Sequence, residues 1–176
     1  MFKQKFTART LPLTGVILLS LGATSGVNAT TATSNLAVNA SVTANCTIST
    51  TAVAFGAYDP VSANASTALN GSGAVNVTCT SGASATLTLG QGANADTGST
   101  DAVPARRMND GSTHYLAYTL YQDSGRSTVW GNTAGTGVAN TGTGTQVAVT
   151  VYGAVAAAQN VPAGSYSDTV VATVTF

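Results

Sequence analysis

Apolar and polar residues alternate with a period of two in six stretches of this chain. In an extended strand, this period places every second side chain on the same face. The alternating apolar positions are Leu36, Val38, Ala40 and Val42; Val75, Val77 and Cys79; Leu87 and Leu89; Leu116, Tyr118 and Leu120; Val147, Val149 and Val151; and Val170, Ala172, Val174 and Phe176. The pattern predicts short β-strands and an all-β fold.

Turn-forming residues lie between several of these stretches. They are Asp59-Pro60, Asn70-Gly71, Asn109-Asp110-Gly111 and Ser124-Gly125. Residues 131–145 are rich in Gly, Thr and Asn and have little hydrophobic pattern, which indicates a loop or a weak edge strand. Residues 153–158 could form one helical turn at most, because Pro162 follows closely. Six or seven short strands separated by turns predict a single immunoglobulin-like β-sandwich.

Two of the alternating stretches have no obvious partner in an ordinary sandwich. The N-terminal one, residues 30–42, is separated from the strand that carries Cys46 only by Thr43-Ala44-Asn45, which is short for a reversal. The C-terminal one stops at Phe176 with no later strand to cover its edge. A sandwich that lacks its last strand has an exposed apolar groove, which is costly and prone to aggregation. We expect the N-terminal stretch to fill such a groove, in its own subunit or in the next one.

The composition narrows the class of protein. Charged residues make up only 7% of the chain, against about 25% in an average soluble domain. Lys and Arg balance Asp and Glu at six each, so the chain lacks the basic surface that a nucleic-acid-binding protein needs. Disordered chains combine low hydrophobicity with high net charge, and this chain does not. Small residues, Thr and Val favour strands and turns.

Residues 1–29 have the layout of a secretory signal peptide. Lys3, Lys5 and Arg9 form a positive start, residues 11–23 are apolar, and Val27-Asn28-Ala29 is a small-residue cleavage site. A membrane anchor is the alternative, but the apolar stretch is shorter than the roughly 20 residues that span a bilayer. After cleavage, three arginines remain against six aspartates, which gives a net charge of −3. We therefore expect a soluble, exported protein.

Export determines what the two cysteines are expected to do. In an oxidising compartment, Cys46 and Cys79 are predicted to form a disulfide. The alternatives are two free thiols or a metal pair. Two cysteines with a single histidine in the chain do not make a zinc site.

Residues with catalytic or binding chemistry are sparse, and we expect no enzyme, no cofactor and no metal site. His114 is the only histidine, and we expect it to face solvent or a neighbouring strand. The chain has no Gly-x-Ser-x-Gly, Cys-x-x-Cys or phosphate-loop motif. Asp96 and Asp101 are expected to be solvated loop carboxylates, with a calcium pair as the alternative.

Two other features each have a structural and a functional interpretation. One arginine of Arg106-Arg107 is expected to pair with an aspartate, and a contact between subunits is the alternative. Trp130 and the tyrosines are expected to fill the core rather than hold a sugar.

Several short motifs, in this order, resemble the spore coat protein U domain family, which includes subunits of archaic chaperone–usher pili. They are Ala44-Asn45-Cys46-Thr47-Ile48, Phe55-Gly56-Ala57-Tyr58-Asp59-Pro60, Val75-Asn76-Val77-Thr78-Cys79-Thr80, Arg107-Met108, Leu116-Ala117-Tyr118-Thr119-Leu120-Tyr121, Trp130-Gly131, Val151-Tyr152-Gly153 and Gly164-Ser165-Tyr166-Ser167-Asp168-Thr169-Val170. They cover most of residues 44–176. In composition and length, the chain looks most like the major rod subunit of such a pilus.

The resemblance implies a mode of assembly called donor-strand exchange. A periplasmic chaperone first lends a strand to the open groove of the subunit. The N-terminal strand of another subunit then replaces it at an outer-membrane usher. The implied partners are therefore the chaperone, the usher, other copies of this chain and other pilus subunits. Such pili extend from the cell surface and support attachment and biofilm formation.

This resemblance predicts three segments: a signal peptide at 1–29, a donor strand at 30–43 and a pilin domain at 44–176. Leu36, Val38, Ala40 and Val42 are the donor residues that we expect to be inserted. Val170, Ala172, Val174 and Phe176 are expected to form one wall of the acceptor groove and to contact the chaperone. The alternative functions are a monomeric surface or coat domain, or a sugar-binding adhesin.

Overall fold

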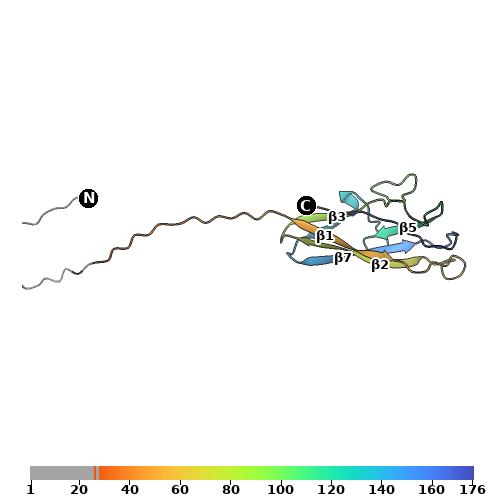
Figure 1. Ribbon diagram of the computed structural model, residues 1–176, viewed down its shortest axis with the longest axis horizontal. Coiled ribbons are helices and arrows are strands. Elements are labelled where there is room, and N and C mark those ends of the chain that lie inside the picture. The colour runs from red at the N-terminus through yellow and green to blue at the C-terminus, as the bar shows by residue number, and fades with distance from the viewer. Residues whose placement is uncertain (1–25, 27) are drawn as a thin grey trace, which may run out of the picture. The chain divides into compact units, whose positions relative to one another are not determined.

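Eight strands and one short 3-10 turn make up the ordered elements of the computed structural model, which describes residue 26 and residues 28–176 (Figure 1). The elements are β1 (Cys46–Ala54), β2 (Leu69–Cys79), β3 (Ser84–Leu89), β4 (Arg106–Asn109), β5 (Tyr115–Tyr121), η1 (Ala134–Thr136), β6 (Val138–Thr141), β7 (Gln146–Val155) and β8 (Ala172–Thr175). The predicted signal peptide lies outside the described residues, except for residues 26, 28 and 29. Within the described part of the chain, no helix is long and apolar enough to cross a membrane.

The strands form two sheets in which all pairs are antiparallel. The five-stranded sheet has the order β1-β2-β7-β5-β4, and the three-stranded sheet has the order β6-β3-β8. The apolar alternation within each strand places one face of each sheet toward the other. The predicted all-β sandwich is therefore confirmed.

The core lies between the two sheets and consists mainly of the alternating residues. Its buried members are Val75, Val77, Cys79, Ala85, Leu87, Leu89, Leu116, Tyr118, Leu120, Trp130, Val151 and Val155. Trp130 has no exposed surface, and its indole Nε1 donates a hydrogen bond to the carbonyl of Leu87 at 2.9 Å. Trp130 therefore belongs to the core, as expected, and is not available to hold a sugar at the surface.

The structure contains the expected disulfide between Cys46 and Cys79. Cys46 opens β1 and Cys79 closes β2, and the two residues are direct partners in the register of this strand pair. The two cysteines are 33 residues apart in the sequence, and the chain-entropy model gives roughly 3–4 kcal/mol for closing such a loop. It therefore fixes the start of an edge strand to its neighbour.

Two local predictions are wrong. Asn70-Gly71 is not a turn, because both residues lie inside β2 and pair with Ala154 and Gly153 of β7. Residues 153–155 are not helical, because they complete β7 and pair with both β2 and β5. In both cases, the long β2–β7 ladder overrides the local turn or helix preference.

One prediction about a sheet edge is confirmed. β6 lies inside the Gly- and Thr-rich stretch 131–145 and is an edge strand, in agreement with the expected weak edge. The free side of β4 is partly covered, because Asn109 and Ser167 exchange two backbone hydrogen bonds of 2.8 and 3.0 Å. β1 and β8 are also edge strands, and each pairs with one other strand only among the described residues.

Candidate functional site

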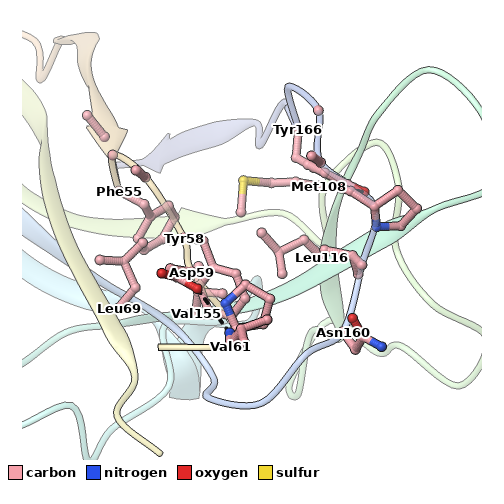
Figure 2. Close-up of a pocket in the computed structure, with 18 of the residues that line it drawn as sticks. Phe55, Tyr58, Asp59, Val61, Leu69, Met108, Leu116, Val155, Asn160 and Tyr166 are labelled. Carbon is pink, nitrogen blue, oxygen red and sulfur yellow. Dashed lines mark hydrogen bonds between the residues drawn. The ribbon is translucent and has the colours of Figure 1, made fainter. Parts of the chain in front are cut away.

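An apolar groove lies between the edge strand β1 and the segment that leads into the edge strand β8. It consists of two cavities. The smaller, of about 470 Å³, is lined by residues 50–53 of β1 and residues 166–170 before β8. The larger, of about 700 Å³, continues beyond the end of β1 toward residues 160–164. Figure 2 shows Phe55 and Leu69 on one side of the larger cavity and Met108 and Tyr166 on the other.

Four side chains line both cavities: Val53, Phe55, Met108 and Tyr166. The two cavities therefore adjoin at these side chains, which we call the waist. All four are half-buried and pack against the core. The waist thus divides one continuous groove into two compartments.

A bulge in β1 brings Val53 and Phe55 into the groove. The β1–β2 register runs to Thr51 opposite Ala74 and resumes with Ala54 opposite Ser72, so β1 has one extra residue. The bulge lies on Gly73, where a Cβ would be 2.5 Å from the carbonyl oxygen of Thr51. A side chain at residue 73 would therefore push the bulge away from the sheet.

The ring of Phe55 rests on two further glycines of the five-stranded sheet. A Cβ on Gly71 would lie 2.9 Å from this ring, and a Cβ on Gly153 would lie 2.6 Å from it. The ring also makes an edge contact with Tyr118, with 6.0 Å between the centroids. Phe55 therefore cannot move further toward the sheet and remains at the waist.

The predicted C-terminal wall is only partly placed along the groove. Val170 and Ala172 line the smaller cavity, and Val174 is half-buried against the core. The side chain of Phe176 is 54% exposed. Backbone groups on the free side of β8 have no strand partner among the described residues, so this wall presents both apolar side chains and hydrogen-bonding groups.

A polar cluster holds the segment that precedes β8. The hydroxyl of Tyr118 donates to one oxygen of Asp168 at 2.7 Å, and the backbone and side-chain N–H groups of Asn94 donate to the other, both at 3.1 Å. Burial and the Asp168 carboxylate raise the pKa of Tyr118 well above its usual value. Gly92 leaves the space that Asp168 occupies, since a Cβ there would overlap the carboxylate. These contacts therefore hold the segment around Asp168, and with it the C-terminal wall of the groove, in place.

The expected donor residues lie in a stretch that forms no strand in the structure. Residues 28–45 are exposed and outside any helix or strand. Leu36, Val38 and Val42 have 85–87% of their surface exposed, which is unusual for large apolar side chains that recur on one face. The end of this stretch, from residue 43 onward, is hydrogen-bonded to Thr80. The Thr80 hydroxyl accepts a hydrogen bond from the N–H of Asn45 at 3.1 Å, and the N–H of Thr80 donates one to the carbonyl of Asn45 at 2.9 Å.

The remaining candidates make structural contacts. His114 lies 2.7 Å from Asp110 in the turn between β4 and β5, and it is exposed. Asp96 pairs with Arg107 at 3.0 Å, as expected for one arginine of the pair. Asp101 accepts hydrogen bonds from Gln91 and Asn132, which lower its pKa. Over residues 26 and 28–176, no group of three His, Cys or Asp side chains could hold a metal ion.

Sequence reasoning did not find the waist. Val53 lies in a bulge and Phe55 follows it, and the bulge breaks the alternation that reveals a strand. Met108 lies in a strand of only four residues, and Tyr166 lies in no strand at all. The only signal for them is that three of the four lie in motifs of the family resemblance, namely Phe55, Met108 and Tyr166.

Comparison with known proteins agrees with that resemblance. The spore coat protein U domain model matches residues 32–173. Protein U of Myxococcus xanthus is 50% identical over an alignment of 164 residues, and the match covers 89% of this chain and 92% of that protein.

A chain of a solved structure has a similar fold. It comes from the crystal structure of the CsuC–CsuE chaperone–tip adhesion subunit pre-assembly complex from archaic chaperone–usher Csu pili of Acinetobacter baumannii. The two chains are 21% identical, with a TM-score of 0.54, and the match covers 77% of this chain and 40% of that one. This likeness supports the immunoglobulin-like sandwich.

Proposed function

Because the chain belongs to the spore coat protein U domain family, we propose that it is the major structural subunit of a chaperone–usher pilus and polymerises by donor-strand exchange. In this proposal, the N-terminal stretch of one copy lies in the groove between β1 and β8 of the next copy. Head-to-tail contacts of this kind do not close, so they generate a fibre. The fibre is exported through the periplasm to the cell surface, where it serves attachment and biofilm formation.

One observation carries the proposal: the chain has both an apolar groove between two unpaired strand edges and an exposed stretch with the matching apolar alternation. The groove offers the free sides of β1 and β8. The stretch offers Leu36, Val38, Ala40 and Val42 on one face. A strand added between two edges forms main-chain hydrogen bonds on both sides and places alternate side chains in the groove.

The free energies of burial and hydrogen bonding favour insertion of the N-terminal stretch into the groove over its exposure to water. Burial of a Leu or Val side chain contributes about 1.5–3 kcal/mol relative to leaving it in water. Each main-chain hydrogen bond adds about 1 kcal/mol. Three such side chains and a row of hydrogen bonds can outweigh the loss of freedom of a segment that is unstructured before insertion. The family match begins at residue 32, so the shared sequence pattern includes this stretch.

The partners follow from the exposed groove. A subunit with an open apolar groove would aggregate in the periplasm, so we infer that a periplasmic chaperone supplies a temporary strand. An outer-membrane usher then exchanges that strand for residues 30–43 of another subunit. The solved complex that contains a chain of similar fold is itself a chaperone–subunit complex, which supports the chaperone as a partner.

A charge on the donor face tests the proposal. Val38→Asp would place a carboxylate in a dry groove without a partner, at a cost of several kcal/mol. The control is Ala37→Asp, which adds the same charge on the opposite face of the same stretch. Both variants are produced with the chaperone and usher, and surface fibres are counted by electron microscopy.

We expect Val38→Asp to abolish fibres while the yield of chaperone-bound subunit stays near that of the wild type, because the chaperone supplies its own strand. Ala37→Asp should form fibres. Normal fibres from the Val38→Asp variant would contradict the proposal and leave residues 30–43 without a role in assembly.

A second candidate is a surface or coat protein that acts as a monomer. The family description, a spore coat protein domain, favours it. The two candidates differ in their need for the N-terminal stretch. Deletion of residues 30–43 would leave a monomeric coat domain functional, whereas it would stop a donor-strand polymer.

A further inference from the structure

We propose that Ala40 sets the register of the donor strand by lying at the waist, opposite Val53, Phe55, Met108 and Tyr166 of the receiving subunit. This inference rests on the proposed function. It names the one donor position whose size is limited by the groove, and it follows from the shape of the groove and the pattern of the stretch.

A strand that occupies both cavities must cross the waist. Side chains on one face of a strand are separated by about 7 Å, twice the rise per residue. The four donor positions therefore span about 20 Å, long enough to reach from one cavity into the other. One of the four positions must then lie at the waist when the others occupy the two cavities.

The waist is lined by four larger side chains of the receiving subunit, three of which are held in place by their surroundings. Phe55 cannot retreat, since its ring already rests on the backbone of Gly71 and Gly153. Val53 belongs to the bulge that lies on Gly73. On the facing side, Tyr166 is tied by a hydrogen bond from its hydroxyl to the carbonyl of Pro162 at 2.9 Å. Met108 is the most adaptable of the four.

Only one of the four donor positions is small. Leu36, Val38 and Val42 are large aliphatic residues, and Ala40 has a single methyl group. With Ala40 at the waist, Leu36 and Val38 lie in one cavity and Val42 in the other. Any shift by two residues would place a Leu or Val at the waist and require the displacement of packed side chains, which cores resist.

Ala44 lies on the same face but does not compete for the waist. Its neighbour Asn45 is fastened to Thr80 of its own domain by two hydrogen bonds of 3.1 and 2.9 Å. Residue 44 therefore belongs to the base of the stretch in the donating subunit. Ala40 is the last small residue on this face before that base.

The test uses the full chain as a homopolymer, so that each subunit contact contains both a donor position 40 and a waist. Ala40→Leu adds bulk at the waist, and Ala37→Leu makes the same change on the opposite face. Met108→Ala and Phe55→Ala enlarge the waist, and each is combined with Ala40→Leu. The readout is the fraction of subunit recovered in fibres, together with the guanidinium concentration at which purified fibres dissociate.

We expect Ala40→Leu to lower the assembled fraction at least tenfold and Ala37→Leu to leave it within twofold of the wild type. At least one enlarged waist should restore Ala40→Leu to within threefold of the matching waist variant alone. Two rescuing variants are used because Phe55→Ala removes a half-buried aromatic ring and could impair folding, whereas Met108→Ala is milder.

The outcomes separate this inference from the proposed function. If wild-type fibres form, Val38→Asp prevents them, and Ala40→Leu assembles like the wild type, the register is wrong and the donor role stands. A loss on Ala40→Leu that neither enlarged waist reduces would also overturn the register. If Val38→Asp assembles normally, the proposed function fails, and this inference fails with it.

Discussion

Arg106 holds the two sheets of the sandwich together from inside the core, and its replacement by Met should be strongly destabilising. Arg106 lies in β4 of the five-stranded sheet and is 1% exposed. Its guanidinium donates hydrogen bonds to the carbonyls of Leu89 and Trp130 through Nη2 at 2.7 and 2.8 Å, and to that of Gly90 through Nε at 2.8 Å. Leu89 ends β3 of the three-stranded sheet.

Two effects of opposite sign determine how much Arg106→Met changes the free energy of unfolding. Burial lowers the pKa of Arg106 to about 10, so the group is still charged at neutral pH and bears a desolvation cost. Nη1 also has no hydrogen-bond acceptor among the residues that the structure describes. Arg106→Met relieves both costs. It also leaves three carbonyls without donors, and each unpaired buried polar group costs about 1–3 kcal/mol.

The loss of three hydrogen bonds to buried carbonyls outweighs the relief, so we expect a net decrease of about 3–5 kcal/mol in the free energy of unfolding. For a domain of this size, that corresponds to a fall in Tm of roughly 10 °C. Chemical denaturation of the oxidised, purified chain measures it. The matched control is Arg107→Met at the next residue.

Arg107 is half-buried: it pairs with Asp96 at 3.0 Å, lies 4.2 Å from the ring centre of Tyr115, and donates to the carbonyls of Asn94 and Ala95 at 3.2 and 3.1 Å. Exposed ion pairs and cation–π contacts are each worth up to about 1 kcal/mol. The carbonyls of Asn94 and Ala95 are only part-buried, so water can replace their hydrogen bonds, and Arg107→Met should cost about 1–2 kcal/mol. Equal losses of stability for the two variants, or an Arg106→Met protein as stable as the wild type, would contradict the role of Arg106 in holding the two sheets together.

Three further predictions concern the bridge, the C-terminal wall and a loop carboxylate. Replacement of both Cys46 and Cys79 by Ser should lower the free energy of unfolding by roughly 2–5 kcal/mol; an intact mass that shows two free thiols in periplasmic protein would contradict the bridge. Removal of residues 174–176 should abolish co-purification with the chaperone, and a wild-type yield would place the groove elsewhere. Asp123 accepts backbone hydrogen bonds from Thr128 and Ser127, which lower its pKa below 3.8, so Asp123→Asn should destabilise the chain at pH 7. The difference should disappear as the pH falls through the lowered pKa, and a difference that persists at pH 2 in denaturation curves would contradict this.

The strands that alternate cleanly could be predicted from the sequence. Val75 to Cys79 and Leu116 to Leu120 follow a period of two because one face of each strand is buried. The disulfide could be predicted from export and from the number of cysteines. The ends of β2 and β7 could not, because Asn70-Gly71 and residues 153–155 have turn or helix preferences that only their mutual pairing overcomes.

The groove was predicted as a missing strand, but its shape was not. The shape depends on glycines that have no local signal, since Gly71, Gly73 and Gly153 matter only through the β1 residues that lie on them. Arg106 shows the same limit. The sequence suggests an aspartate partner for one of two adjacent arginines, and only the three-dimensional arrangement shows that Arg107 has it and that Arg106 bonds to carbonyls.

Hydrogen exchange of the N-terminal stretch tests the central claim most directly. In fibres isolated from producing cells, the backbone N–H groups of residues 36–42 should exchange slowly, because they are bonded to the edges of β1 and β8 of the next subunit. In chaperone-bound subunits, the same groups should exchange as fast as those of an unstructured peptide, since residues 28–45 form no strand within the subunit. Fast exchange of residues 36–42 in the fibres would contradict donor-strand exchange by this segment.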